Sequence, residues 1–238
     1  MGRAIFHIAL LACSVLPLTG ASAWAGYCGD DVDGGRVACS CGDFVVSDTH
    51  LRADDPVVTE RCPADGLIVQ ASHGGDGIVL DLGGLSIVGS DAGVGILVIA
   101  GGSGGAVVSG GEDERRPGQI VGFTTGMRAH GQRSVRVVSN LDFRGNRGDG
   151  LALRGHGSLS VESVGAFANG RNGLRLGGRG ADVAALRATD NGQHDIDLAT
   201  TAAAAKARES GYSLDLPNVH GRIRLPERSD SGAARESR

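Results

Sequence analysis

The sequence predicts an all-β protein, a right-handed parallel β-helix of about six or seven coils with a disulfide-stapled N-terminal cap and a helix-forming segment near the C-terminus. Three observations lead to this prediction. A short motif recurs every 22 to 31 residues, glycine makes up 41 of 238 residues, and four of the five cysteines lie close together near the N-terminus. The glycines are interleaved with valine, leucine and isoleucine, which is typical of many short strands separated by tight turns.

The recurring motif is a small turn residue followed by two apolar residues with any residue between them, as in Gly66-Leu67-Ile68-Val69. The turn residue stands at positions 66, 95, 126, 150, 173 and 195, which gives intervals of 29, 31, 24, 23 and 22 residues. Alternation of apolar with other residues indicates strands with one inward and one outward row. Each coil buries its inward row only against its neighbours, so several coils must stack.

Three asparagines, Asn146, Asn169 and Asn191, stand four positions before the turn residues of the last three full coils. Such a column could form a ligand site. Asparagine also tolerates the left-handed backbone conformation and hydrogen-bonds an identical residue stacked above it. We therefore expect a structural asparagine corner between strands.

Helical repeats of similar length are the alternative architecture. They require apolar residues at i, i+3 and i+4 over ten or more positions, and each glycine inside a helix costs roughly 1 kcal/mol. Only residues 199–209 have a helical pattern, and they are expected to cap the C-terminal end or to interrupt the last coil. The charged, serine-rich residues 226–238 are predicted to be a disordered tail.

The first 25 residues have the pattern of an export signal. Arg3 provides the positive start, an apolar stretch follows, and small residues allow cleavage near Ala23 or Ala25. No later stretch has the roughly 18 apolar residues of a transmembrane helix. We expect a signal peptide at 1–25, a cysteine-containing cap and first coil at 26–65 and coils at 66–225. The expected product is secreted or periplasmic and has no membrane span.

The charge balance limits the kinds of molecule that the protein is expected to bind. The chain has 23 Lys and Arg residues against 27 Asp and Glu residues, which gives a formal net charge of −4. A mildly acidic chain lacks the excess positive charge that displaces phosphate counterions. Nucleic acid is therefore not expected as a partner, and the composition leaves the oligomeric state open.

An exported chain favours disulfides among the cysteines that follow the signal, which are Cys28, Cys39, Cys41 and Cys62. Four cysteines allow three pairings. Partners in a Cys-x-Cys segment rarely reach disulfide geometry, so we favour Cys28–Cys39 with Cys41–Cys62. A zinc site is the alternative, but the Cys-x-Cys spacing suits it poorly and the compartment is oxidising. Two disulfides here would staple the first coil, which has no neighbour on one side.

Residues 41–49 (CGDFVVSDT), 62–69 (CPADGLIV) and 78–84 (IVLDLGG) resemble the opening of exported right-handed parallel β-helix repeat proteins of the pectin-lyase-like superfamily. The resemblance is close over about 45 residues and extends to the later coils by pattern only. It implies the fold, the N-terminal cap and an extracytoplasmic location. Because this fold serves lyases, hydrolases, epimerases and many non-catalytic proteins, the resemblance implies no single activity.

The catalytic candidate is His156, which lies in a Gly-His-Gly segment similar to that of the polygalacturonases. Glycoside cleavage needs two carboxyl groups within about 5 to 10 Å of each other. The nearest upstream Asp pair, Asp54-Asp55, ends 101 positions before His156 (156 − 55), and a histidine in a glycine turn is the simpler interpretation. No metal or other cofactor is predicted, and calcium would enter only if the protein were a lyase.

Four cationic or titratable residues, Arg128, His130, Arg154 and Arg175, fall on one outward sheet face across three consecutive coils. Guanidinium groups bind carboxylates in bidentate contact, so this face is a hypothetical site for an anionic polysaccharide. The alternative is that these arginines only keep an exposed sheet soluble. The sequence favours a non-catalytic structural or carbohydrate-binding module at the cell envelope. The alternative function is a polysaccharide lyase, epimerase or hydrolase that acts on uronate-containing glycans.

Overall fold

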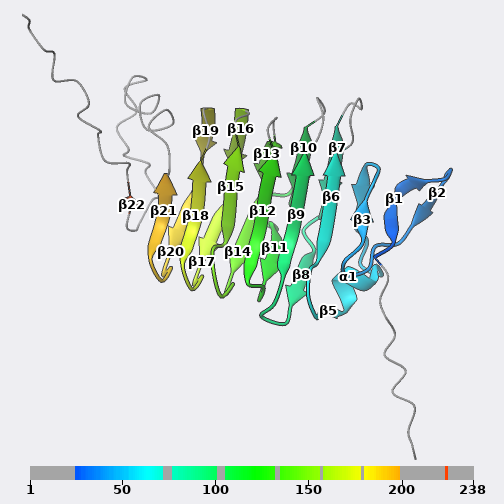
Figure 1. Ribbon diagram of the computed structural model, residues 1–238, viewed down its shortest axis with the longest axis horizontal. Coiled ribbons are helices and arrows are strands. Elements are labelled where there is room, and N and C mark those ends of the chain that lie inside the picture. Colours follow the sequence, from blue (N-terminus) through cyan, green and yellow to red (C-terminus); the bar gives the residue numbers. More distant parts are fainter. Residues whose placement is uncertain are drawn as a thin grey trace, which may run out of the picture.

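The computed structural model describes residues 25–71, 77–100, 105–131, 135–155, 158–177, 180–198 and 223–224. These residues form an all-β structure of three sheets with one helical turn, α1 (Pro56–Thr59). Every strand pairing within the sheets is parallel except the β1–β2 hairpin. Figure 1 shows the strands standing side by side along the long axis, with the hairpin at one end.

Sheet 1 has ten strands in the order β2-β1-β3-β6-β9-β12-β15-β18-β21-β22. Its strands are β1 (Tyr27–Val32), β2 (Gly35–Val37), β3 (Phe44–Val45), β6 (Leu67–Ala71), β9 (Val94–Ala100), β12 (Thr125–Gly131), β15 (Leu151–Gly155), β18 (Asn172–Gly177), β21 (His194–Leu198) and β22 (Ile223–Arg224). This sheet contains every predicted repeat motif. One apolar-x-apolar triplet lies in each of β6, β9, β12, β15, β18 and β21.

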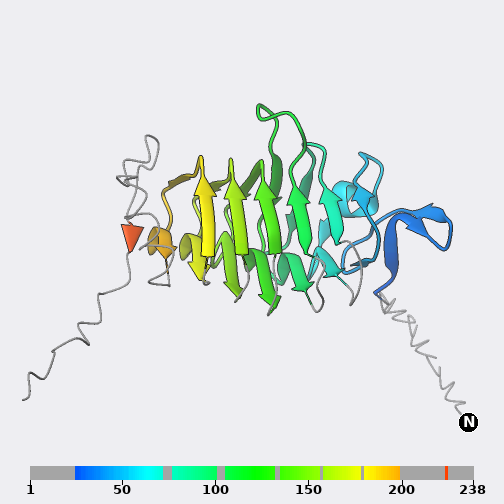
Figure 2. The same cartoon turned by 90° about the horizontal axis from the view of Figure 1, so that it is seen from above.

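Two six-stranded parallel sheets complete the structure. Sheet 2 contains β4 (Thr49–His50), β7 (Ile78–Asp81), β10 (Ala106–Ser109), β13 (Val135–Ser139), β16 (Ser158–Glu162) and β19 (Gly180–Ala184). Sheet 3 contains β5 (Arg61–Cys62), β8 (Ser86–Gly89), β11 (Gly118–Val121), β14 (Leu141–Arg144), β17 (Gly165–Phe167) and β20 (Arg187–Thr189). From β3 to β21 the chain visits sheets 1, 2 and 3 in rotation, and we call each such passage a repeat. Figure 2 shows from above how successive repeats follow one another along the long axis.

The core is built by the inward row of each strand. On sheet 1 the six motif positions are in register from β6 to β21, and each side chain is at most 2% exposed. These residues are Leu67, Ile96, Met127, Leu151, Leu174 and Ile196. Burial of one such side chain stabilises the fold by roughly 1.5–3 kcal/mol, and each repeat obtains it only by stacking on its neighbours. The predicted repeat is therefore present as a continuous stack of buried side chains.

Asn146, Asn169 and Asn191 form a buried hydrogen-bonded ladder at the corner between sheet 3 and sheet 1. The side-chain amide of Asn146 donates to Oδ1 of Asn169 at 2.9 Å, and that of Asn169 donates to Oδ1 of Asn191 at 2.9 Å. The same oxygens accept the backbone N–H of the preceding asparagine at 3.1 and 3.0 Å. The amides of Asn146 and Asn169 thus satisfy polar groups of the repeats on either side of their own.

One expectation about this corner was wrong. The asparagines are not the residues in the left-handed conformation; that conformation lies one position earlier. The residues concerned are Gly145 (φ 57°), Ala168 (φ 53°) and Asp190 (φ 61°). A left-handed conformation costs a residue with a Cβ roughly 1–2 kcal/mol, and the paired amides that follow offset that cost.

The N-terminal cap is joined by two disulfides, Cys28–Cys39 and Cys41–Cys62, which is the pairing favoured from the sequence. Three of the four cysteines are essentially buried, and Cys41 packs against the same core. The helical turn α1 begins at Pro56, whose fixed φ suits the first helical position. Its fully buried Val57 donates a backbone hydrogen bond to the carbonyl of Cys39 at 3.0 Å, so α1 closes the end of the core beside the disulfides.

Several predicted features lie outside the described residues. These are positions 1–24 of the expected signal, the helical segment 199–209, the tail 226–238 and His156. Within the described part of the chain, no helix has the length and apolar character needed to cross a membrane.

Candidate functional site

The outward face of sheet 1 brings the predicted arginines onto neighbouring strands. In one outward row Arg128 on β12 is the register partner of Ala152 on β15, which is the partner of Arg175 on β18. In the second row His130, whose backbone belongs to β12, is the partner of Arg154 on β15. The register therefore places all four predicted positions on three adjacent strands.

Arg128 and Arg154 are cations of this face that have no acidic partner among the described residues. Arg154 is exposed, and the guanidinium of half-buried Arg128 donates to the Thr125 hydroxyl at 3.3 Å. No ion pair joins either arginine to a carboxylate among residues that the structure describes. Ala152 faces outward but is only 8% exposed, and it lies between Arg128 and Arg175 in the same row.

Arg175 is different because two carboxylates flank it. Its Nε lies 3.4 Å from Oδ2 of Asp197, and its NH1 lies 3.9 Å from Oδ2 of Asp149. Only 27% of the Arg175 side chain is exposed. An anion that approached Arg175 would meet the negative charge of both aspartates, so Arg175 mainly orders the surface.

Sequence reasoning missed the role of Asp149, which belongs to a polar column directly before the turn residues. The column consists of Thr125, Asp149, Asn172 and His194. Oδ1 of Asp149 accepts hydrogen bonds from the backbone and side-chain nitrogens of Asn172 at 3.2 and 2.8 Å, and Nδ1 of His194 lies 3.1 Å from Oδ1 of Asn172. The recurrence of polar residues one position before the last four turn residues was the available signal.

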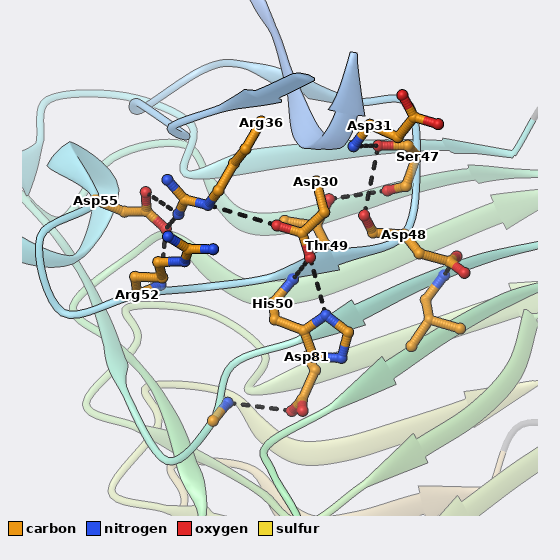
Figure 3. Close-up of polar contacts among 12 residues, drawn as sticks. Asp30, Asp31, Arg36, Ser47, Asp48, Thr49, His50, Arg52, Asp55 and Asp81 are labelled. Carbon is orange, nitrogen blue, oxygen red and sulfur yellow. Dashed lines mark hydrogen bonds and ion pairs between the residues drawn. The ribbon is translucent and has the colours of Figure 1, made fainter. Parts of the chain in front are cut away.

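A second polar cluster lies in the cap and is drawn in Figure 3. Arg36 of β2 donates from NH2 to both carboxylate oxygens of Asp55, at 2.6 and 2.8 Å. Asp55 is fully buried and also accepts the backbone N–H of Arg52 at 2.8 Å. Nε of Arg36 lies 3.5 Å from Oδ1 of Asp30, so one guanidinium links the hairpin to the segment before α1.

Asp30 also contacts His50 on β4, and the contact shifts the pKa of both groups. Oδ2 of Asp30 lies 2.9 Å from Nδ1 of His50 and accepts its backbone N–H at 2.9 Å. The hydrogen bond to Asp30 raises the pKa of His50 above 6.5 although burial opposes the shift, and the charges of Asp30, Asp81 and Asp48 add to the rise. Burial tends to raise the pKa of Asp30, but the hydrogen bonds and charge of His50, with the charge of Arg36, hold it below 3.8.

The cap cluster is best understood as a clamp between the hairpin and the first strands of sheet 2. Its carboxylates are already engaged by Arg36, His50 and backbone N–H groups (Figure 3). Across the described ranges, no group of three or more His, Cys, Asp or Glu side chains is arranged to hold a metal ion. The arginine face of sheet 1 is therefore the candidate site, and the cap cluster is a structural neighbour.

Comparisons with known proteins add no assignment. No protein-family model matches the chain, and no curated protein or solved structure matches it.

Proposed function

We propose that the three sheets form a right-handed parallel β-helix of the pectin-lyase-like type, and that the protein is an exported, non-catalytic module that binds an anionic glycan at the cell envelope. Rotation of the chain through three parallel sheets supports the fold. Disulfides persist in oxidising compartments, so the cap supports export. The ligand class is a uronate-containing polymer.

One observation carries the proposed function: Arg128 and Arg154 lie on adjacent strands of one outward face and have no carboxylate partner within the described residues. Neighbouring strands are about 4.8 Å apart, so the row from Arg128 to Arg175 spans roughly 10 Å, comparable with a pair of sugar rings. Guanidinium groups present a planar fork that fits a carboxylate. The binding contribution is assigned mainly to Arg128 and Arg154, because Asp149 and Asp197 neutralise Arg175.

The test measures retention of the protein on immobilised polygalacturonate and alginate at low salt. The Arg128→Ala, Arg154→Ala double variant should weaken binding at least tenfold, and Arg175→Ala should weaken it less. Its matched control is Arg147→Ala with Arg171→Ala, which removes the same charge from two exposed turn residues. Equal binding by both double variants would contradict the proposal. An unsaturated product that absorbs in the near ultraviolet would instead identify the protein as a lyase.

A further inference from the structure

Sheet 1 has an apolar outward row over its first strands, with further apolar side chains beside it. Its inward row is already buried in the core, so these side chains face away from the core with no strand packed over them in the described residues. We call the following set the apolar ladder: Tyr27, Phe44, Val46, Ile68, Leu97 and Ile99.

The ladder is continuous across four neighbouring strands. Tyr27 on β1 is the register partner of Phe44 on β3, which is the partner of Ile68 on β6 and then of Leu97 on β9. The rings of Tyr27 and Phe44 are 6.2 Å apart between centroids. Ile99 lies in the second outward row of β9.

The ladder is well exposed for apolar side chains. Tyr27 is 65% exposed, Ile99 41% and Val46 39%, which are three of the four most exposed large apolar residues in the described part of the chain. Contiguous exposed apolar surface usually marks a contact with a partner or an apolar ligand.

The ladder ends where the arginine face begins. Leu97 on β9 is the register partner of Arg128 on β12, and Ile99 is the partner of His130. The outward row from Tyr27 to Leu97 is therefore apolar from β1 to β9, and the face is cationic on β12 and β15. In the second outward row exposed Gln70 is the partner of Ile99, so that row is only partly apolar. Three strand intervals of about 4.8 Å give the ladder a length of about 14 Å. One leaflet of a bilayer, half of a core of roughly 30 Å, has acyl chains of about 15 Å.

We infer that the anionic glycan carries an alkyl or acyl chain, so the ligand is an anionic glycolipid. This inference rests on the proposed function. The anionic sugar contacts Arg128 and Arg154, and the chain lies across β9, β6, β3 and β1 towards Tyr27. A second copy of the protein accounts for this face less well. Two copies that paired their ladders symmetrically would leave the adjacent arginines without a role.

The test compares three soluble probes by isothermal titration calorimetry below their micelle concentrations. Dodecyl glucuronide has both charge and chain, methyl glucuronide has the charge alone, and dodecyl maltoside has the chain alone. We expect dodecyl glucuronide to bind at least tenfold more tightly than either of the other probes. Arg128→Ala with Arg154→Ala should bring its affinity down to that of dodecyl maltoside.

Variants of the ladder separate the chain contact from the sugar contact. Leu97→Gln with Ile99→Gln should reduce the advantage of dodecyl over methyl glucuronide to less than threefold without weakening methyl glucuronide. The matched control is Val79→Gln with Val107→Gln, register partners on an outward row of sheet 2. Tyr27→Ser opens no core, since Tyr27 is 65% exposed, and should weaken dodecyl glucuronide while sparing octyl glucuronide.

The outcomes distinguish the two proposals. Equal affinity for dodecyl and methyl glucuronide, with polygalacturonate still retained through the arginines, overturns the glycolipid inference and leaves glycan binding intact. Failure of polygalacturonate and both glucuronides to bind overturns both proposals. If light scattering shows a dimer that the Leu97→Gln, Ile99→Gln variant converts to a monomer, the ladder is an interface between copies and the inference is wrong.

Discussion

Asn146 and Asn169, which are 23 residues apart in the sequence, share two hydrogen bonds through one side-chain oxygen. Oδ1 of Asn169 accepts both the backbone N–H and the side-chain amide of Asn146, at 3.1 and 2.9 Å. The amide of Asn169 in turn donates to the carbonyl of Phe143 at 3.1 Å. This arrangement links these repeats by polar contacts inside a buried corner, where an unmade hydrogen bond is costly.

The first prediction concerns this ladder. Asn169→Ala would leave the buried backbone N–H of Asn146 and the carbonyl of Phe143 without these partners. Each buried polar group left unpaired costs about 1–3 kcal/mol, so we expect a loss of at least 2 kcal/mol in the free energy of unfolding. Urea denaturation followed by circular dichroism measures it, with exposed Gln70→Ala as the near-neutral control. A loss as small as that of the control would show that the ladder is dispensable.

The second prediction concerns the buried pair in the cap. Arg36→Met keeps the length of the side chain but removes the partner of both oxygens of Asp55, which is fully buried. Breaking a buried ion pair from one side typically costs 3–5 kcal/mol. The double variant Arg36→Met, Asp55→Leu should recover much of that loss because no isolated charge remains. Thermal unfolding of the three proteins checks this order, and a double variant no more stable than the single variant would contradict it.

The third prediction concerns pH. The hydrogen bond to Asp30 raises the pKa of His50 above 6.5, so its contribution to stability is complete below pH 6.5 and is lost as the pH rises through the folded-state pKa. Burial tends to raise the pKa of Asp30, but His50 keeps it below 3.8. The contribution of Asp30 to stability is therefore lost only as the pH falls through its lowered folded-state pKa. The contact is therefore strongest between pH 3.8 and pH 6.5.

Titration of the His50 imidazole by NMR measures this effect directly. In Asp30→Asn the pKa of His50 should fall towards 6.5, and the stability difference between pH 5.5 and pH 8.5 should shrink. His50→Gln should shrink that difference in the same way. An unchanged His50 titration in Asp30→Asn would remove the basis of the prediction.

The fourth prediction concerns Gly165 on β17. A Cβ at this position would meet Oδ1 of Asp142 and the ring of Phe167, on which the guanidinium of Arg144 stacks at 4.5 Å from the ring centroid. Gly165→Ala should therefore destabilise the protein by about 1–3 kcal/mol through overpacking. Gly35→Ala is the matched control, because a Cβ there meets nothing within 4 Å. Equal urea midpoints for the two variants would show that the outward face of sheet 3 tolerates the extra methyl group.

The sequence allowed the repeat, the strand faces and the cysteine pairing to be predicted, because each depends on local spacing. The inward row that runs from Leu67 to Ile196 is periodic, and the Cys-x-Cys geometry argues against pairing Cys39 with Cys41. The left-handed conformation of Ala168 could not be predicted, since alanine has no intrinsic preference for it and its backbone N–H donates to the carbonyl of Thr189 in the next repeat, 21 positions on (189 − 168).

The candidate site was predicted less completely than the fold. The register placed Arg128, Arg154 and Arg175 on one face, but the charge of that face depends on side chains from other positions. Asp149 stands before a turn glycine and reads as a turn residue, yet its carboxylate lies beside Arg175. Likewise, the contact between Asp30 and His50 exists only after the hairpin folds back across 20 residues of sequence.

The covalent links of the described structure are concentrated at one end, between Cys28 and Cys62. Because each repeat contacts only its neighbours, the cap stabilises the first repeat directly and the later repeats only through the repeats between them. The disulfide-linked cap therefore provides a fixed strand edge on which the next strand of sheet 1 pairs. We therefore expect unfolding to begin at the end of the stack that is opposite the disulfides.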